Sequence, residues 1–189
     1  YPIHIKYNTG LNRIGFLPTE TNWIIKSLNK SSLTIKSVYS HLAISEEKKP
    51  NKTSEKQINL FKSIITKYTN KKNIKPFFHL LNSSGIFNYP DLELDAVRPG
   101  ISLYGYANNF HWDKDLLPIS SLTTKVFQIH NVKKGDSVGY NNGWFAKKNS
   151  KIGVIPIGHA DGIPRSFGMQ KGWFTIKNKK AYIVGNICM

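Results

Sequence analysis

Strand-like and helix-like segments alternate across the first 106 residues, and this alternation constrains the fold more than any other feature of the sequence. Apolar runs of the strand type are separated by two segments whose apolar side chains recur at helical spacing. The expected strands cover residues 2–7, 33–43 and 77–81, with a loop at 46–54, and the expected helices cover residues 19–30 and a segment that begins at Ser54. Strands that alternate with helices in this way form a parallel sheet with the helices packed outside it.

The pattern changes from Leu116 onward. Short apolar runs at residues 122–129, 151–157, 173–176 and 181–187 are separated by polar, glycine-containing or asparagine-containing turns. No helical period is visible in this part, and strands at such spacing are typical of a small β-barrel or sandwich. We therefore place a boundary in the linker at residues 108–118 and predict an α/β domain over residues 1–113 and a β domain over residues 114–189.

The composition is that of an ordinary globular protein. Hydrophobic residues make up 40% of the 189 residues, which is sufficient for a buried core. No run approaches the length of a membrane span, and the N-terminal residues do not resemble a signal peptide. A cytoplasmic location without a membrane partner is the default expectation. The single Cys188 allows no internal disulfide, which agrees with a reducing compartment.

The net charge of +16 reflects 27 lysine and arginine residues against 11 acidic residues. Such an excess can mark a nucleic-acid-binding protein. The lysines are scattered through sequence rich in asparagine and isoleucine, however, and they do not form a stripe with interleaved aromatic residues. A general drift in composition explains the charge more simply, so we expect no nucleic-acid partner.

Residues 77–106 contain the groups best suited to bind a ligand. The first apolar run ends on the small polar residues 82–85, and a second run at residues 101–104, expected to be a strand, follows Arg98. In parallel α/β barrels, loops at the C-terminal ends of strands expose N–H groups that can hold a phosphate. We interpret this stretch as half of a cofactor-binding site. The alternative is that residues 82–85 only cap a helix and that Arg98 is a surface residue.

This stretch resembles a segment of the bacterial alanine racemases, which use pyridoxal phosphate and bind it through an Asn-Ser pair and an Arg-x-Gly-Ile run. Further segments resemble the same family in the same order. They are HIKYNTGLNRIGF at residues 4–16, VYSHLA at 38–43, and GVIPIGHADGIPR with IVGNICM at 153–165 and 183–189. Together these segments span nearly the whole chain, and four ordered motifs are more specific than any one of them.

The resemblance implies an α/β plus all-β fold class, in which the second half of a (β/α)8 TIM-type barrel precedes part of a C-terminal β domain. It also implies a racemase that interconverts L-alanine and D-alanine and supplies D-alanine for peptidoglycan. The family works as a homodimer with active sites at the interface. A related racemase for serine or another small amino acid, and a cofactor-binding homologue without catalytic activity, are the alternatives.

The resemblance also assigns the residues that would hold pyridoxal phosphate. Arg98 matches the arginine that contacts the pyridine nitrogen, and His41 matches a histidine that packs beside the ring. Ser83, Gly100 and Ile101 match contacts to the phosphate. No metal site is expected.

Other matched residues belong to the substrate side of the site. Arg13 matches the arginine near the substrate carboxylate, and Met189 matches a residue whose backbone lies near the substrate. Lys6 matches a lysine that is carbamylated in several members, where the new carboxylate pairs with that arginine. Asn8 departs from the family, in which an aspartate is usual, and this changes the charge balance near Arg13.

His159 is the most important departure from the family pattern. The family has a tyrosine at this position, which is the base on one face of the substrate and is contributed across the dimer interface. A histidine can take a proton near neutral pH, so the exchange is chemically reasonable. The alternative is that the site has lost its base.

The lysine that forms the imine with the cofactor belongs to an earlier barrel strand in the family, upstream of the segment that matches Tyr1. We therefore interpret the chain as an internal fragment that is inactive by itself. Half a barrel leaves strand edges unpaired, so we expect the isolated fragment to be unstable or prone to aggregation.

Overall fold

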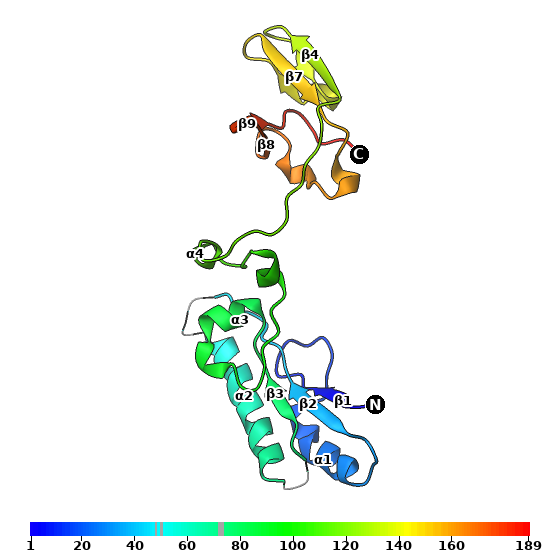
Figure 1. Cartoon of the computed structure of the whole chain (residues 1–189), viewed down its shortest axis with the longest axis vertical. Helices are drawn as coiled ribbons and strands as arrows, with labels where there is room; N and C mark the ends of the chain where they lie inside the picture. The colour runs from blue at the N-terminus through cyan, green and yellow to red at the C-terminus, as the bar shows by residue number, and fades with distance from the viewer. Residues whose placement is uncertain (48, 50, 72–73) are drawn as a thin grey trace. The chain divides into compact units, whose positions relative to one another are not determined.

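The computed structural model describes residues 1–47, 49, 51–71 and 74–189. The chain forms two compact units, Tyr1–Ser121 and Leu122–Met189, and each is described by itself (Figure 1). The predicted boundary after residue 113 stays a prediction. None of the described helices is both long and apolar enough to cross a membrane.

The first unit is built on a parallel sheet of three strands, in the order β1-β2-β3 (Figure 1). The strands are β1 (Ile3–Lys6), β2 (Ile35–Tyr39) and β3 (Phe77–His79), and they are joined by helices α1 (Thr21–Asn29) and α2 (Lys52–Thr69). The alternation expected from the sequence is therefore present. The sheet is open, and the described strands do not close into a barrel.

Local signals in the sequence explain where the two helices begin. A short 3-10 helix, Pro18–Glu20, leads directly into α1. The side chain of Asn51 caps α2 by accepting a hydrogen bond from the Ser54 N–H, so the helix begins two residues before Ser54. Of the loop predicted at residues 46–54, residues 48 and 50 lie outside the described residues.

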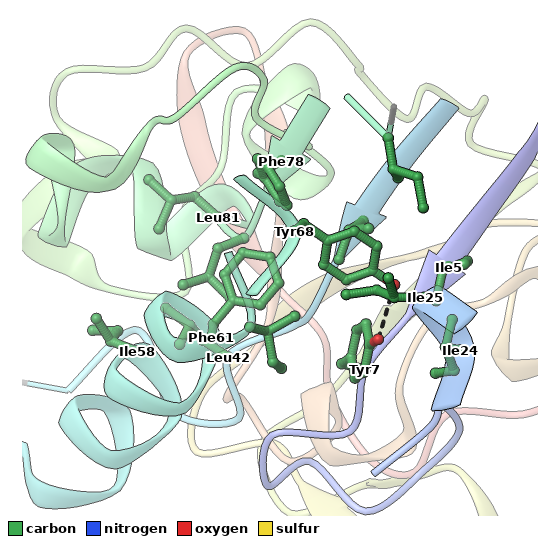
Figure 2. Packing of buried hydrophobic residues seen from close by; sticks show 14 of the residues in the cluster. Ile5, Tyr7, Ile24, Ile25, Leu42, Ile58, Phe61, Tyr68, Phe78 and Leu81 are labelled. Carbon is green, nitrogen blue, oxygen red and sulfur yellow. Dashed lines mark hydrogen bonds between the residues drawn. The ribbon is translucent and has the colours of Figure 1, made fainter. Parts of the chain in front are cut away.

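One face of the sheet and the inner faces of α1 and α2 form the core. Alternate strand residues such as Ile5, Val38 and Phe78 are buried against Phe61 and other apolar helix residues (Figure 2). The hydroxyl groups of Tyr7 and Tyr68, both fully buried, share a hydrogen bond of 2.9 Å. Burial is the main cause that raises the pKa of each tyrosine, so both stay neutral and the polar pair is compatible with the core.

Side chains alternate across a strand, so the opposite face of the sheet carries a different set of residues. Its members from the three strands are polar or aromatic, and they are His4, Lys6, Ser37, Tyr39, Phe77 and His79. The candidate site of the first unit is built on this face.

The segment after β3 differs from the expectation for residues 101–104. These residues form a 3-10 helix, Ile101–Tyr104, and not a strand. The Leu103 N–H bonds to the Gly100 carbonyl, and Gly105 ends the turn in the left-handed region with φ of 83°. The strand prediction is wrong because local hydrogen bonds and the glycine turn close this segment on itself.

The extended segment lies earlier, next to β3. The Asp95 N–H bonds to the Phe78 carbonyl, and the Arg98 N–H bonds to the Leu81 carbonyl at 2.9 Å. Arg98 precedes Pro99, and a residue in that position is biased toward extended backbone. Helix α3 (Ser83–Asn88), the 3-10 helix Pro90–Leu92 and helix α4 (Phe110–Asp113) complete the unit.

The second unit contains antiparallel strand pairs. Strands β4 (Gln128–Val132) and β7 (Ser150–Val154) pair, as do β5 (Ser137–Val138) with β6 (Trp144–Phe145) and β8 (Trp173–Ile176) with β9 (Lys179–Tyr182). Three 3-10 helices are the only helical segments in this fully described unit: Tyr140–Asn142, His159–Asp161 and Arg165–Phe167. The expectation of a β unit after the α/β unit is therefore confirmed.

We expect Phe61→Ala to destabilise the first unit strongly, because Phe61 is 1% exposed and the truncation leaves a cavity. Large-to-small changes of this kind cost about 3–5 kcal/mol. Urea unfolding followed by circular dichroism would measure the loss. The matched control is Lys62→Ala, one residue along α2 on the exposed side, which should change stability by less than about 0.5 kcal/mol. Equal effects of the two changes would contradict the packing described.

Candidate functional site

Arg98 is the centre of the polar face of the first unit. Its Nη2 donates to the Ser40 carbonyl at 2.7 Å and to the Leu80 carbonyl at 3.1 Å, and its Nη1 contacts His79 Nδ1. The guanidinium carbon also lies 5.1 Å from the centre of the Tyr39 ring. These contacts come from the C-terminal ends of β2 and β3, so both strands fix the orientation of Arg98.

The guanidinium keeps donors for a ligand. Arginine has five N–H groups, and the close contacts above engage three of them. A longer contact of 3.4 Å joins Nη2 to His41 Nδ1. Arg98 is half-buried, and burial lowers its pKa from the usual value, but an arginine remains charged at any physiological pH. It can therefore present a permanent hydrogen-bond donor to an acceptor atom.

His79 is a functional residue that the sequence reasoning missed. Burial first, and then the charges of Arg98 and His4, lower the pKa of His79 to about 4. The neutral ring accepts from Arg98 and is stacked on Tyr39 with 4.9 Å between ring centres. Its position in the apolar run at residues 77–81 gave the only signal, because a histidine on the face away from the core needs polar partners.

Ser83 collects hydrogen-bond donors at the start of α3. Its hydroxyl oxygen receives the Gly100 N–H at 2.8 Å and the Ser102 N–H at 3.3 Å, and the Ser102 hydroxyl lies 3.2 Å away. Ile101 lies between these two donors and begins the 3-10 helix. The predicted residues Ser83, Gly100 and Ile101 are thus brought together, and Asn82 caps α3 at the same place through the Gly85 N–H.

This group of donors has the chemistry of an anion site. Ser84 is buried, and its hydroxyl finds no hydrogen-bond partner in the described part of the chain. The first residues of a helix also have N–H groups without intrahelical partners. Hydroxyl and backbone N–H donors of this kind hold phosphate groups in many proteins. Helix capping and ligand binding, which the sequence presented as alternatives, are compatible here.

Lys6, Arg13 and Arg98 form a cluster of positive charge, which we call the cation cluster. Burial, then Arg13 and Arg98, lower the pKa of Lys6 below its usual value. The pKa of His41 is lowered by burial first, and then by Arg98, Arg13 and Lys6. The cluster favours a neutral Lys6 amine and a neutral His41 ring, and it would be stabilised by a bound anion.

In the second unit, the structure brings His159 and Met189 together. The His159 N–H donates to the Cys188 carbonyl, and the next N–H, of Ala160, donates to the Met189 carbonyl, both at 2.9 Å. Gly158 precedes them, and a Cβ at this position would lie 2.2 Å from the Cys188 carbonyl oxygen. Only glycine therefore allows this close approach of the two segments.

The ring of His159 has one close polar neighbour. Nη2 of Arg165 lies 3.1 Å from His159 Nε2. Since arginine only donates, Nε2 must be the acceptor and Nδ1 must carry the proton of the neutral ring. His159, half-buried in its turn, thus has an available lone pair that Arg165 holds in one direction.

Comparison with known proteins gives the same answer over both units. The family described as "Alanine racemase, N-terminal domain" matches residues 1–108, and "Alanine racemase, C-terminal domain" matches residues 119–189. The alanine racemase of Treponema denticola is 36% identical over 194 residues, which cover 99% of this chain and 50% of the relative. The chain thus spans about half the length of that relative.

Two other similarities are informative. A serine/alanine racemase of Enterococcus gallinarum is 33% identical over 98% of this chain and 27% of its own length. The structure of an alanine racemase from Bartonella henselae, described with covalently bound pyridoxal phosphate, is 30% identical. It matches all of this chain and 50% of its own chain with a TM-score of 0.74.

The lowered pKa of His79 predicts how stability depends on pH. An unfolded histidine titrates near about 6.5, whereas folded His79 titrates near about 4. The unfolded state therefore binds a proton more readily between these values, and the free energy of unfolding falls as the pH falls from about 6.5 to about 4.

We expect His79→Gln to remove about 1–3 kcal/mol of this loss, because the buried ring no longer has to be protonated. Urea unfolding at pH 7 and at pH 4.5 would measure it. The control is His130→Gln, which changes an exposed histidine of β4. A pH dependence that is the same in wild type and His79→Gln would contradict the burial of a neutral His79.

Proposed function

Because this chain belongs to the alanine racemase family, we propose that it is part of a pyridoxal phosphate-dependent enzyme that interconverts L-alanine and D-alanine. The observation that carries the proposal is Arg98, a half-buried arginine fixed by two strand ends and His79, with donors left for a ligand. D-alanine made in this way would be used in peptidoglycan. The first unit would contribute the second half of a (β/α)8 barrel.

The residues of the first unit fit the three parts of the cofactor. Ser83, Gly100 and Ile101 offer hydroxyl and N–H donors for the phosphate. Arg98 offers a donor for the ring nitrogen, and His41, 3.4 Å from Arg98, would lie beside the ring. When bound, pyridoxal phosphate withdraws electrons from the α-carbon of the amino acid and so makes its proton removable.

The use of arginine at the ring nitrogen would control the reaction outcome. Arg98 always donates, so the ring nitrogen cannot also carry a proton. Electron withdrawal is then limited, and the α-carbon regains a proton before slower side reactions such as transamination occur. Arg98 would therefore favour racemisation over loss of the amino group.

Lys6 and Arg13 would serve the substrate side. The lowered pKa of Lys6 favours the neutral amine, which is the form that reacts with carbon dioxide to give a carbamate. The carbamate would place a negative charge in the cation cluster and hold Arg13. Arg13 would then bind the substrate carboxylate.

His159 would remove or return the α-proton on one face of the substrate. In a homodimer it would reach the site of the partner subunit, with the Met189 backbone beside it. Its Nε2 lone pair would have to be released by Arg165 before it takes a proton. The base for the other face would be a lysine outside this chain.

Serine is a second candidate substrate. It is favoured by the similarity to the serine/alanine racemase of E. gallinarum. The complete protein should therefore be tested with both enantiomers of alanine and of serine. Conversion of alanine with the higher kcat/KM supports the main proposal, conversion of serine with the higher kcat/KM supports the second, and no conversion of either in protein loaded with cofactor overturns both.

We expect Arg98→Glu in the complete protein to lower racemisation by about 10²-fold or more, since one fixed donor is lost where charge develops. A carboxyl group at the ring nitrogen also favours its protonation, so pyruvate should form from alanine by transamination. Chiral chromatography and a lactate dehydrogenase assay would follow the two products. Arg98→Lys, which keeps a positive charge, is the control and should form less pyruvate. Unchanged racemisation in Arg98→Glu would make Arg98 only structural.

We expect His159→Phe to reduce racemisation by about 10²–10⁴-fold, the usual contribution of a general base. The two directions should respond unequally, because each base serves one enantiomer. Solvent deuterium incorporation at the α-carbon of L-alanine and D-alanine would report each face separately. The control is His111→Phe, on helix α4 of the other unit. Equal, wild-type exchange of both enantiomers in His159→Phe would remove His159 from the mechanism.

A further inference from the structure

A row of hydrogen-bonded side chains leads from Arg98 across all three strands of the first unit. His79 Nδ1 lies 2.5 Å from Arg98 Nη1, and His79 Nε2 lies 2.9 Å from Ser37 Oγ. Ser37 Oγ in turn lies 2.6 Å from His4 Nδ1. His79, Ser37 and His4 come from β3, β2 and β1, and their side chains share the face of the sheet that carries the candidate site.

The direction of every hydrogen bond in this row follows from Arg98. A guanidinium has no acceptor, so His79 Nδ1 must accept and the proton of the neutral ring must lie on Nε2. This Nε2–H then donates to Ser37 Oγ. The Ser37 hydroxyl is left to donate to His4 Nδ1, which must be unprotonated. A single arrangement of protons satisfies all three contacts.

Burial makes the row difficult to replace by water. Ser37 is 0% exposed and His79 is 8% exposed, whereas His4 at the end of the row is exposed. Stacking on Tyr39 at an angle of 7° further restricts the His79 ring. The low pKa of His79, about 4, agrees with a neutral ring that gives one proton and accepts another.

We propose that Ser37, oriented by His4, is a positioning residue that holds His79 in its Nε2–H form and thereby fixes the Arg98 guanidinium. Its significance for racemisation depends on the proposed function, but its effect on His79 does not. Neither Ser37 nor His4 touches the groups that would bind cofactor or substrate, so both act only through His79.

The loss of the Ser37 hydroxyl would have a definite consequence. The buried Nε2–H would have no acceptor, and an unsatisfied buried donor is costly. The ring can relieve this by moving its proton to Nδ1. Nδ1–H would then face the N–H of Arg98, two donors would oppose each other, and the guanidinium would shift from its place between Ser40 and Leu80.

Solid-state nitrogen-15 NMR of the complete, cofactor-loaded protein with labelled histidine would test this directly, since the ring nitrogens report the tautomer. His79 is identified by the signals missing from His79→Gln. We expect a single Nε2–H form in wild type. In Ser37→Ala the tautomer ratio should shift about tenfold or more toward Nδ1–H.

Two further variants complete the test. Ser54→Ala is the matched control, because Ser54 is equally buried but donates only to the Ile44 carbonyl, at 3.3 Å; it should leave His79 unchanged. His4→Phe, at the exposed end of the row, should shift the ratio in the same direction as Ser37→Ala but less. It also decides the matter if Ser37→Ala does not fold. Wild-type His79 signals in Ser37→Ala, or in His4→Phe where that variant alone folds, would overturn the proposal.

The same proteins give a kinetic measurement. Ser37→Ala should lower kcat for racemisation by about three- to tenfold, with the KM for alanine within about twofold of wild type, and it should form some pyruvate, since Arg98 is displaced but present. An unchanged kcat with a shifted tautomer would overturn the link from His79 to Arg98. A wild-type protein without racemase activity would overturn the proposed function alone, because the NMR result still decides the role of Ser37.

Discussion

The need to satisfy a half-buried arginine organises the polar face of the first unit. Arg98 finds its acceptors at the ends of two neighbouring strands, in the carbonyl groups of Ser40 and Leu80, and in the ring of His79. A buried charge is costly unless its hydrogen bonds are made. The strand ends, the tautomer of His79 and the extended backbone before Pro99 must therefore agree with one another, and a change in any of them affects the group that would contact the ligand.

The same residues explain why this face requires a ligand. Lys6 and Arg13 lie close enough to Arg98 to affect one another's charge, and the described contacts of Arg98 are to neutral groups. Like charges in partial burial repel, so the arrangement is stabilised by an anion, whether a carbamate on Lys6, a phosphate or a substrate carboxylate. The donors around Ser83 extend the anion-binding surface along the same stretch of chain.

Periodicity predicted the β-α-β-α-β order of the first unit and the β character of the second, because side-chain spacing reports which face of an element is buried. It did not predict the turn at residues 101–104, where Gly105 and bonds to Ser83 override an alternating pattern. It also could not reveal His79. That residue matters through Arg98, Ser37 and Tyr39, contacts that link distant positions and leave no local signal. The motif at residues 153–165 drew attention to His159, but only the structure showed its contact with Arg165.

The turn that carries His159 is fixed by backbone geometry and does not depend on the side chain at that position. Gly158 and its neighbours pair with the Cys188 and Met189 carbonyl groups at a distance that excludes any Cβ, and Asp161 accepts the Gly158 N–H at 2.8 Å. These constraints hold the backbone of residue 159 whether it carries a phenol or an imidazole. An exchange of one for the other therefore changes the reacting atom and its reach but not the placement of the turn. In this chain the functional question at residue 159 becomes one of chemistry at Nε2, where Arg165 and a substrate proton would compete for the same lone pair.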